Sequence, residues 1–391
     1  MISVKQAKKI LSEICWQLDS EILNVVEASG RVISKNIFTS IDVPSFDNSA
    51  MDGYAILYEK DKTSYDVYDT IQAGDTNMHE LKKGAAARIY TGAPIPKGAN
   101  AVIQQELVTL NNNEINFEPG CIEQGANVRN QGSQCKVGDM IVKENTKITP
   151  GIISLLISVG IVEISVYKNP KIKIIVTGNE LVEPGNCINR GQIYNSNEPA
   201  IIAYLKMLGI HMVNSIRVKD DKDQLQKEIS EALNKVDILI LSGGISVGDY
   251  DFVYETLQKE DVDILFYKIK QKPGKPILAA KKNETLIFAL PGNPAAVLTC
   301  LNQYVKPCVK YMRGFKEIFN RKTLLPLAHF WEKKGAMANI LKAVVKNGKV
   351  YILHGQDSFN LLPFKEANSF VLLHENEMIK NKGELVEVYN W

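Results

Sequence analysis

Residues 242–251 read Ser-Gly-Gly-Ile-Ser-Val-Gly-Asp-Tyr-Asp, and they combine the residue types that hold a phosphorylated ligand and a metal ion. Glycines allow backbone amides to approach an anion closely. The carboxylates of Asp249 and Asp251 are ligands of the type that Mg²⁺ prefers. The segment therefore predicts a phosphate and metal site, although a tight turn between a strand and a helix would need the same glycines. The residues that we expect to contact substrate here are Ser242, Gly243, Gly244, Ser246, Gly248 and Asp249.

Three other segments with polar or glycine-rich chemistry follow predicted strands. They are Thr177-Gly-Asn-Glu-Leu181, Lys272-Pro-Gly-Lys-Pro276 and Leu290-Pro-Gly-Asn-Pro294. Each has an ordinary structural explanation, since glycine and proline also mark turns and helix starts. Their occurrence together favours one shared site. Carboxylates would hold Mg²⁺ against a phosphate there, and lysines would hold a second anion.

A strand–helix alternation between residues 171 and 312 must position these segments. We expect strands at 171–176, 212–218, 236–241, 264–269, 277–280 and 285–290, and helices at 197–208, 223–234, 251–259 and 294–312. Asp223 and Asn293 are the expected caps of two of these helices. The alternation predicts a doubly wound, mostly parallel α/β sheet. Ligands of such sheets bind at the carboxyl ends of the strands, where the four segments would meet.

The rest of the chain has other periodicities. Ile10, Ile14, Leu18 and Ile22 recur at four-residue steps and predict a helix within residues 3–27. Short strands between turn signals predict a β-rich unit at 65–118, and Thr149 with Pro150 predicts a helix start. Further short strands at 340–345, 350–354, 369–373 and 385–389 predict a small, barrel-like C-terminal β domain. The fold class is therefore a multidomain α/β protein.

Length and composition limit the classes of function. The 391 residues are enough for several domains, and apolar (45%) and charged (23%) contents are ordinary for a globular protein. A formal net charge of +2 gives no reason to expect a nucleic acid or an anionic membrane as partner. The most apolar stretch, 152–162, is too short to span a bilayer, and the charged N-terminus does not resemble a secretory signal. Six cysteines without a CxxC pair predict a reducing, cytoplasmic location and no cysteine metal site.

Several catalytic motifs are absent from the sequence. It contains no GxxxxGK[ST], which argues against a P-loop NTPase, and no strand followed by GxGxxG, which argues against a nicotinamide dinucleotide fold. It also lacks the GxSxG of a nucleophile elbow. A small-molecule site that uses phosphate, metal and lysine chemistry remains.

Residues 44–55, Pro-Ser-Phe-Asp-Asn-Ser-Ala-Met-Asp-Gly-Tyr-Ala, are the most distinctive segment outside the sheet. By physics alone they form two polar turns and could simply link domains. Together with Arg88-Ile-Tyr-Thr-Gly-Ala-Pro-Ile-Pro96 and the four sheet segments, they occur in the order seen in one family. Over essentially its whole length the chain resembles molybdopterin molybdenumtransferase, the MoeA family that includes the gephyrin E domain.

The resemblance implies the last step of molybdenum cofactor synthesis. Adenylylated molybdopterin and molybdate would give molybdenum cofactor and AMP, with Mg²⁺ as cofactor. It also implies a homodimer, whose sites form between the sheet domain of one protomer and the N-terminal motifs of the other. Transient contact with a molybdopterin adenylyltransferase and with apo-molybdoenzymes would be compatible with this role. The four expected domains are I (1–49 and 140–168), II (50–139), III (169–315) and IV (316–391).

The resemblance also assigns roles to residues of this chain. Asp52, Glu180, Asp220 and Asp251 are expected to be catalytic, and Glu180 and Asp251 to bind the metal. Lys272, Lys275 and Ser358 are expected to hold molybdate. The other expected substrate-binding residues, from the resemblance and from the loop chemistry above, are Thr91, Arg129, Thr177, Gly178, Lys268, Pro291 and Pro294.

The sequence departs from the family pattern at several positions. Asn179 replaces an acid, Ser133 and Gln134 replace two acids, and Ala296 replaces a serine. Lys342 replaces an arginine, so it is expected to contact an oxyanion as a point charge and not as a bidentate fork.

These departures leave two other hypotheses open. One is a catalytically weak, gephyrin-like dimeric scaffold, although a scaffold has no need for the retained acids and lysines. The other is a nucleotide hydrolase like the competence-damage protein family, which shares the TG-x-EL opening but not FDNSAMDGYA.

Overall fold

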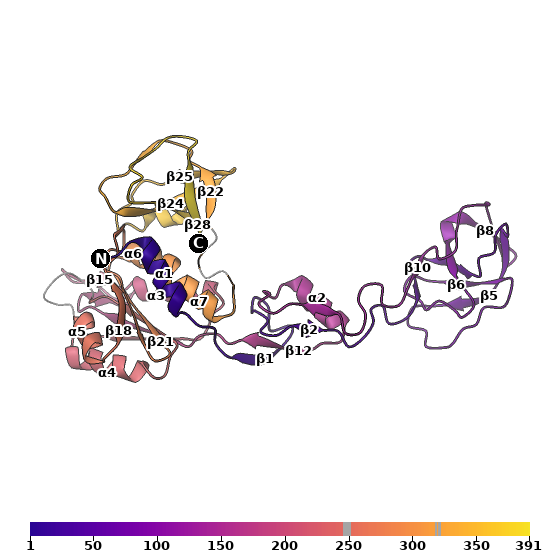
Figure 1. Ribbon diagram of the computed structural model, residues 1–391, viewed down its shortest axis with the longest axis horizontal. Helices are drawn as coiled ribbons and strands as arrows, with labels where there is room; N and C mark the ends of the chain where they lie inside the picture. Colours follow the sequence, from indigo (N-terminus) through magenta and orange to yellow (C-terminus); the bar gives the residue numbers. More distant parts are fainter. Residues whose placement is uncertain (245–251, 317–318, 320–321) are drawn as a thin grey trace.

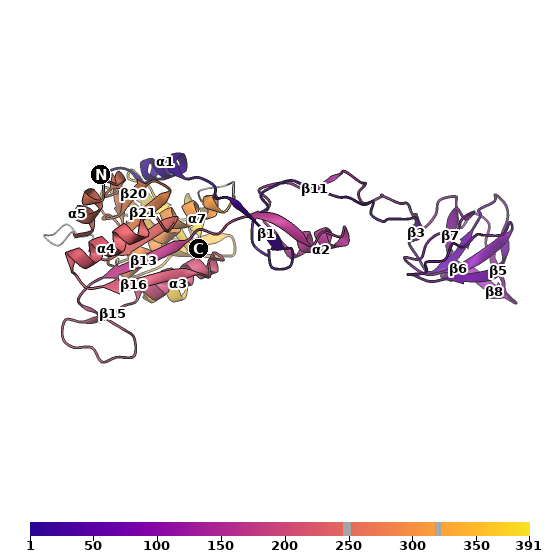
Figure 2. The same ribbon diagram turned by 90° about the horizontal axis from the view of Figure 1, so that it is seen from below.

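The computed structural model describes residues 1–244, 252–316, 319 and 322–391. The chain is elongated, with an α/β unit and a small C-terminal β unit at one end (Figure 1). A narrow middle region joins them to a second β unit at the other end, and the view from below has the same arrangement (Figure 2). Within the described part of the chain, no helix has the length and apolar character needed to cross a membrane.

A six-stranded sheet in the order β16-β13-β17-β21-β20-β18 forms the centre of the α/β unit. The strands are β13 (Ile172–Thr177), β16 (Val213–Val218), β17 (Ile238–Ser242), β18 (Asp263–Tyr267), β20 (Leu278–Lys282) and β21 (Thr285–Leu290). The pairs β13·β16, β13·β17 and β17·β21 are parallel, while β20 is antiparallel to both of its neighbours. β18 therefore runs in the same direction as β21. The α/β fold class is confirmed, and the four chemically distinctive segments follow strands of one common direction.

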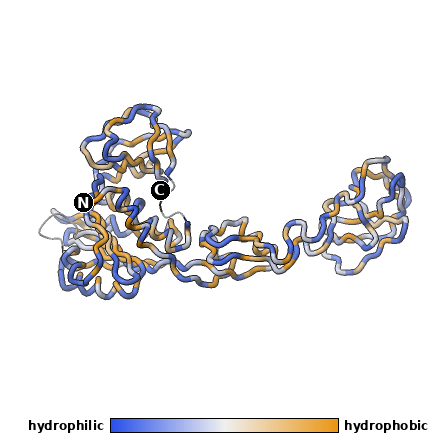
Figure 3. The backbone as a smooth tube through the Cα atoms, in the orientation of Figure 1, coloured by the Kyte–Doolittle hydropathy of each residue, from blue (hydrophilic) through white to orange (hydrophobic). Residues whose placement is uncertain are grey.

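Helices cover both faces of this sheet. The helices are α1 (Val4–Ile14), α3 (Asn197–Met207), α4 (Lys222–Ala232), α5 (Phe252–Lys259), α6 (Pro294–Cys300) and α7 (Lys306–Met312), with a π-helical segment at Leu301–Val305 between the last two. α1, α3, α6 and α7 share one hydrophobic cluster with the sheet, and α4 and α5 share the other. Successive residues of β17 point to opposite clusters, so Ile238 and Ile240 pack on one face and Leu239 and Leu241 on the other. This double coverage explains the unbroken apolar run of β17, and Figure 3 shows the apolar residues concentrated in the sheet.

The caps of two helices differ from the prediction. Asp221, and not Asp223, accepts the capping hydrogen bond of α4, from the amide of Gln224 at 2.8 Å. Asn293 stands before α6, but its side chain makes no capping bond there. Its amide nitrogen donates to Ser358 of the C-terminal unit instead.

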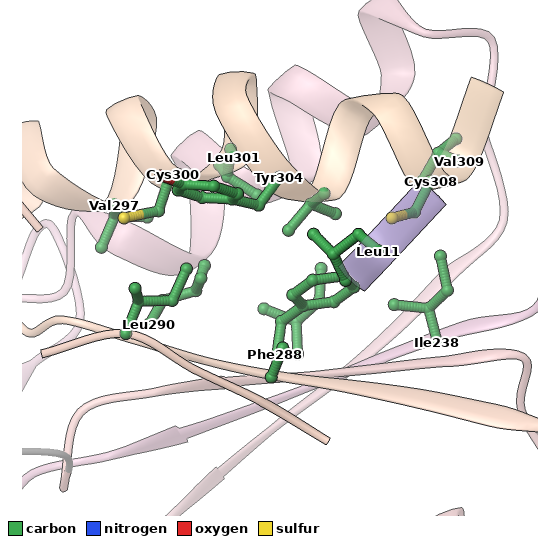
Figure 4. Packing of buried hydrophobic residues seen from close by; sticks show 14 of the residues in the cluster. Leu11, Ile238, Phe288, Leu290, Val297, Cys300, Leu301, Tyr304, Cys308 and Val309 are labelled. Carbon is green, nitrogen blue, oxygen red and sulfur yellow. The ribbon is translucent and has the colours of Figure 1, made fainter. Parts of the chain in front are cut away.

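The first helix is shorter than predicted and belongs to the α/β unit. α1 ends at Ile14, Cys15 is extended, and Ile22 lies in strand β1 (Ser20–Asn24). A four-residue spacing is also two periods of a strand, so Ile22 could not distinguish the two elements. Leu11 is fully buried against the sheet beside residues of α7, which Figure 4 shows from close by. The first residues of the predicted domain I therefore pack on the predicted domain III, and the other domain limits stay a prediction.

The middle region and the far β unit contain the remaining N-terminal motifs. In the middle region β1 pairs with β12 (Glu163–Tyr167), β2 (Ile37–Phe38) pairs with β11 (Met140–Val142), and α2 (Pro150–Ser158) is capped by Thr149 as predicted. The far unit holds a six-stranded sheet in the order β7-β4-β6-β5-β9-β8. Its strands are β4 (Gly53–Ile56), β5 (Ser64–Ile71), β6 (Ala85–Ile89), β7 (Ala101–Gln104), β8 (Val108–Asn111) and β9 (Glu114–Phe117), beside the pair β3 (Asn48–Ser49) and β10 (Val128–Arg129).

The C-terminal β unit is joined to the α/β unit by strand pairing. Its sheet has the order β19-β24-β26-β28-β22, with β25 paired to β24. The strands are β19 (Gln271–Lys272), β22 (Thr323–Pro326), β24 (Ala338–Lys346), β25 (Lys349–Ile352), β26 (Ser369–Leu373) and β28 (Leu385–Asn390). β19 comes from the α/β unit and pairs with β24 in parallel. The lysine segment after β18 is therefore attached to the C-terminal unit.

We expect Leu11→Ala to lower the free energy of unfolding of the α/β unit by about 2–5 kcal/mol, because it leaves a cavity between α1, α7 and the sheet. Chemical denaturation followed by tryptophan fluorescence measures this change, and Trp16, two residues after the end of α1, is one of the three tryptophans that contribute. Lys5→Ala, on the exposed face of the same helix, is the matched control and should change the value by less than about 0.5 kcal/mol. Equal effects of the two substitutions would contradict the packing of α1 on the sheet.

Candidate functional site

A cavity of about 640 Å³ lies at the carboxyl edge of the α/β sheet. Residues from all four strand-end segments line it, together with residues of the C-terminal unit. The lining includes Thr177, Gly178, Glu180, Asp220, Gly243, Gly244, Lys272, Lys275, Pro291, Asn293, Met337 and Ser358. A smaller cavity of about 200 Å³ adjoins it, shares Thr177, Glu180 and Gly243, and is also lined by Ser242 and Pro294.

The glycine turn after β17 lies directly against the end of β13. Gly243 has a φ of +95°, and a Cβ at this position would lie 2.3 Å from the carbonyl oxygen of Thr177. Gly244 also has positive φ, and its Cβ would lie 3.0 Å from the Thr177 hydroxyl. Thr177 is 5% exposed, and its hydroxyl has no hydrogen-bond partner among the described residues. Only glycine fits where the turn approaches β13 this closely. The Thr177 hydroxyl, which is unpaired among the described residues, lies beside the turn.

The lysine loop is fixed from beneath by a buried glutamine. Gln271 is fully buried, and its Nε2 donates to the carbonyl of Gly274 at 3.2 Å, while its Oε1 accepts from the Tyr304 hydroxyl. Gly274 has a φ of +87°, and a Cβ there would lie 2.6 Å from the Cys300 sulfur. Lys272 and Lys275 are exposed on either side of this fixed backbone and both line the cavity. The loop therefore presents two ammonium groups from a rigid support.

Two carboxylates border the cavity near the glycine turn. The amide of Asn179 donates to Asp220 Oδ2 at 3.0 Å, and the amide of Asp220 donates to Asn179 Oδ1 at 3.2 Å. Asn179 thus supplies the acceptor oxygen that the replaced acid would offer. Glu180, the next residue, lines both cavities.

Magnesium would suit these donors. The described residues contain no group of three or more His, Cys, Asp or Glu side chains that could hold a metal ion. Two carboxylates nevertheless fit Mg²⁺, which is commonly bound by one or two carboxylates plus substrate phosphates. Softer metals would need His or Cys ligands that this part of the chain does not supply.

The C-terminal unit closes the lysine end of the cavity. Asn293 Nδ2 donates to Ser358 Oγ at 2.9 Å, and the amide of Ala295 donates to the Ser358 carbonyl at 3.0 Å. Two bonds thus attach the Ser358 turn to the start of α6. Ser358 shares the cavity wall with Lys272 and Lys275, as the sequence predicts for an anion site.

The expected role of Lys342 as an oxyanion contact is wrong. Lys342 is 2% exposed, and its Nζ donates to the carbonyls of Gly355, Asp357 and Asn360 at 2.8, 3.2 and 3.0 Å. All three N–H donors are therefore used within the protein. Burial lowers the pKa of Lys342 to about 8, and the Asp357 carboxylate acts in the opposite direction.

Three expected site residues lie in the far β unit, at the opposite end of the chain from the cavity (Figure 1). The amide and the hydroxyl of Thr91 both donate to Asp52 Oδ1 at 2.8 Å. These bonds, the backbone one above all, lower the pKa of the Asp52 carboxyl. Arg129 Nη2 is 3.5 Å from the carbonyl of Ala50. A single chain brings these three residues together but does not bring them to the cavity.

The other expected site residues are Lys268 and four that the structure does not describe. Lys268 is not among the residues that line the described cavity, and its ammonium lies 4.4 Å from the centroid of the Tyr267 ring. Ser246, Gly248, Asp249 and Asp251 lie outside the described residues.

Asn197 is a polar residue of the smaller cavity that was not predicted to belong to the site. Asn197 opens α3, and its Nδ2 donates to Ser242 Oγ at 3.2 Å and to the carbonyl of Gly292 at 2.8 Å. It thereby joins the glycine turn to the proline loop, and its Oδ1 has no partner among the described residues. The polar run Asn195-Ser-Asn197 at a predicted helix start was the available signal.

Comparisons with known proteins identify the family of the chain. The family model described as "MoeA N-terminal region (domain I and II)" matches residues 2–160, and the model "Probable molybdopterin binding domain" matches residues 173–311. The molybdopterin molybdenumtransferase of Haemophilus influenzae is 32% identical over 410 residues, which cover 99% of this chain and 98% of that protein. The chain belongs to the molybdopterin molybdenumtransferase (MoeA) family. The resemblance drawn from the motifs is confirmed.

Relatives and solved structures extend the family assignment. The Staphylococcus aureus (strain Mu50) molybdopterin molybdenumtransferase is 32% identical over 399 residues, which cover 99% of this chain and 95% of that protein. A crystal structure of the molybdopterin biosynthesis MoeA protein from Pyrococcus horikoshii superposes with a TM-score of 0.84 at 28% identity. That superposition covers 100% of this chain and 99% of the other, so the MoeA fold extends over the whole chain.

We expect Gly243→Ala to destabilise the α/β unit by more than about 1–2 kcal/mol, the usual cost of a left-handed conformation for a residue with a Cβ. The contact with the Thr177 carbonyl adds to this cost. Thermal unfolding measures the change. Gly292→Ala is the control, since a Cβ at Gly292 meets nothing within 4 Å. A Gly243→Ala protein as stable as the control would show that the turn does not lie against β13.

Proposed function

We propose that this protein transfers molybdenum from molybdate to adenylylated molybdopterin and releases AMP, which is the last step of molybdenum cofactor synthesis. The observation that carries the proposal is the single cavity lined by the glycine turn, two carboxylates, two lysines and Ser358. A phosphate anhydride needs amide donors and a metal, and molybdate is an oxyanion that needs cations. The residues that could supply both lie at one edge of the sheet, which supports the proposal.

The glycine turn and its neighbours would bind the pyrophosphate of adenylylated molybdopterin. Gly243 and Gly244 line the cavity without side chains, so their backbone would be the part of the turn that meets an anion. The Thr177 hydroxyl lies beside the same turn and has no partner among the described residues. Ser246, Gly248, Asp249 and Asp251 lie outside the described residues, and their proposed role is to contact the same substrate. No protein nucleophile is needed. An oxygen of molybdate or of water would form a bond to the pterin-side phosphorus while the anhydride P–O bond breaks and AMP leaves. The molybdate oxygens that the dithiolene sulfurs displace would leave as water.

The carboxylates of Glu180 and Asp220, with Asp251, would hold Mg²⁺. When bound, Mg²⁺ would offset the negative charge of the anhydride and polarise its phosphorus–oxygen bonds. The protein's own contribution would be to place the Glu180 and Asp220 carboxylates in the cavity that the glycine turn and the lysine loop also line. Lys272 and Lys275 would hold molybdate beside the dithiolene sulfurs of the pterin, and the Ser358 hydroxyl would donate a hydrogen bond to a molybdate oxygen.

A second copy of the chain would complete the site. The far β unit carries Asp52, Thr91 and Arg129. In this elongated arrangement it lies too far from the α/β unit for these residues to reach the cavity of their own chain (Figure 1). We therefore propose an elongated homodimer in which the far β unit of one protomer approaches the cavity of the other. Such a dimer would work in the reducing cytoplasm, where an adenylyltransferase could supply its substrate and apo-molybdoenzymes could accept its product.

The decisive assay mixes purified protein with adenylylated molybdopterin, Mg²⁺ and molybdate. AMP release together with activation of an apo-molybdoenzyme would support the transferase. Absence of AMP release under all metal conditions would contradict it and would favour the dimeric scaffold.

We expect Lys275→Ala to raise the KM for molybdate about 10- to 100-fold, since a hydrogen bond to a charged group contributes about 1.5–3 kcal/mol. Lys272→Ala should behave in the same way. The readout is AMP release as a function of molybdate concentration. Lys270→Ala is the matched control, because Lys270 is exposed on the same segment but does not line the cavity. Equal KM values for the three variants would remove the lysine loop from molybdate binding.

We expect Glu180→Gln to raise the Mg²⁺ concentration needed for half-maximal AMP release by at least about tenfold, because a neutral amide is a weaker ligand for a hard cation. Treatment of the native protein with a chelator should abolish AMP release, and added Mg²⁺ should restore it. Glu183→Gln is the control, since Glu183 pairs with Arg217 at 3.0 Å outside the cavity. An unchanged Mg²⁺ requirement in Glu180→Gln would exclude Glu180 as a ligand.

A further inference from the structure

Lys342 lies in the middle of β24 and directs every polar group that it has toward one turn. Its buried ammonium donates to the carbonyls of residues 355, 357 and 360. Its backbone amide donates to Gln356 Oε1 at 2.9 Å, and its carbonyl accepts from Gln356 Nε2 at 2.9 Å. Five hydrogen bonds thus connect one residue of the strand to the turn 355–360.

The same turn carries Ser358 to the wall of the cavity. Two of the carbonyls held by Lys342 belong to Asp357 and Asn360, which bracket Ser358. On its other side, Ser358 is bonded to Asn293 and to Ala295 at the start of α6. The turn is therefore held between β24 and α6, and Ser358 lies at the junction.

Strand β24 also supports the lysine loop. Its pairing with β19 sets Lys272 opposite Asn339, three residues before Lys342 on the same strand. The lysines and the serine that border the anion end of the cavity thus depend on one strand of the C-terminal unit. A change in how β24 holds the turn would change the distance between Ser358 and the lysine loop.

Burying an ammonium without a salt bridge is unfavourable unless every donor is used. Only the charged form of Lys342 has three N–H donors for its three acceptors, because a neutral amine keeps two. An apolar side chain at this position would leave three carbonyls without this donor. The charge is therefore suited to fixing the turn, and it is not available to a ligand.

We infer that Lys342 is a positioning residue for molybdate, which acts by holding the 355–360 turn so that Ser358 reaches the oxyanion at the lysine end of the cavity. This inference rests on the proposed function. It assigns to the C-terminal unit a part in anion binding that goes beyond closing the cavity.

The test measures KM for molybdate in the AMP-release assay with the full-length protein. We expect Lys342→Met to raise this KM about tenfold with little change in kcat at saturating molybdate. Lys306→Met is the matched control. Lys306 is also a buried lysine with a pKa lowered to about 8, but it bonds the carbonyl of Asn390 and does not line the cavity.

A double-mutant cycle separates positioning from general destabilisation. If Lys342 acts through Ser358, then Lys342→Met should have almost no further effect on KM in a Ser358→Ala background. Additive effects of the two substitutions would overturn the inference. A KM for Lys342→Met equal to that of the native protein would also overturn it.

The pH dependence of the native protein tests the same idea if Lys342→Met does not fold. Lys342 loses its proton as the pH rises through about 8. Its neighbours are the Asp357 carboxylate, the Phe364 ring, whose centroid lies 5.5 Å from Lys342 Nζ, and Phe370, which pairs with Lys342 from β26. Asp357 is the charged group among these neighbours. KM for molybdate should rise above pH 8 in the native protein, and this rise should be smaller in Ser358→Ala. An identical pH profile in both proteins would contradict the inference, whereas a native protein that releases no AMP would contradict the proposed function itself.

Discussion

The common direction of four strands determines where the chemistry of this protein can occur. β13, β17 and β21 are parallel neighbours, and β18 has the same direction because the intervening β20 is antiparallel to both β21 and β18. The segments that follow these four strands must therefore emerge at one edge of the sheet. A reversal of β18 alone would place Lys272 and Lys275 at the opposite edge from the glycine turn. Hydrogen bonding within the sheet thus brings together cations and carboxylates that are about a hundred residues apart in sequence.

The pairing of β19 with β24 is the second constraint. An open α/β sheet leaves its ligand edge exposed to water, and here a separate β unit covers the lysine end. Because the joining strand is the first part of the lysine loop, any movement of the C-terminal unit acts directly on Lys272. The buried Gln271 and Gly274 then fix the remainder of the loop from the side of α6. A rigid backbone that carries exposed lysines is suited to binding a small oxyanion, since the loop itself does not have to be ordered on binding.

Sequence patterns predicted the sheet and most of its edge, and they failed where tertiary contacts decide. Strands such as β17 and β21 were recognisable from apolar runs bounded by glycine and proline. The limits of α1 were not, because an isoleucine at a four-residue step suits a helix and a strand equally. The position of α1 on the α/β unit, the bonding of Asn179 with Asp220 and the inward direction of Lys342 all depend on residues distant in sequence. A substitution such as arginine to lysine looks conservative by charge, yet here the charge points into the protein.

The elongated form of the chain has a consequence for how a complete site can arise. Asp52 is held by two hydrogen bonds from Thr91, and its carboxyl pKa is lowered although it is far from the cavity of its own chain. An exposed carboxylate that is fixed in this way has lost conformational freedom without contributing to a local core. This loss of conformational freedom would have a function if the Asp52 carboxylate contacted a ligand that is bound in the cavity of another copy of the chain. The narrow middle region would set the distance between the two half-sites, so that one copy of the chain could complete the cavity of another. In that arrangement the middle region would act as a spacer, and its length would matter more than its own chemistry.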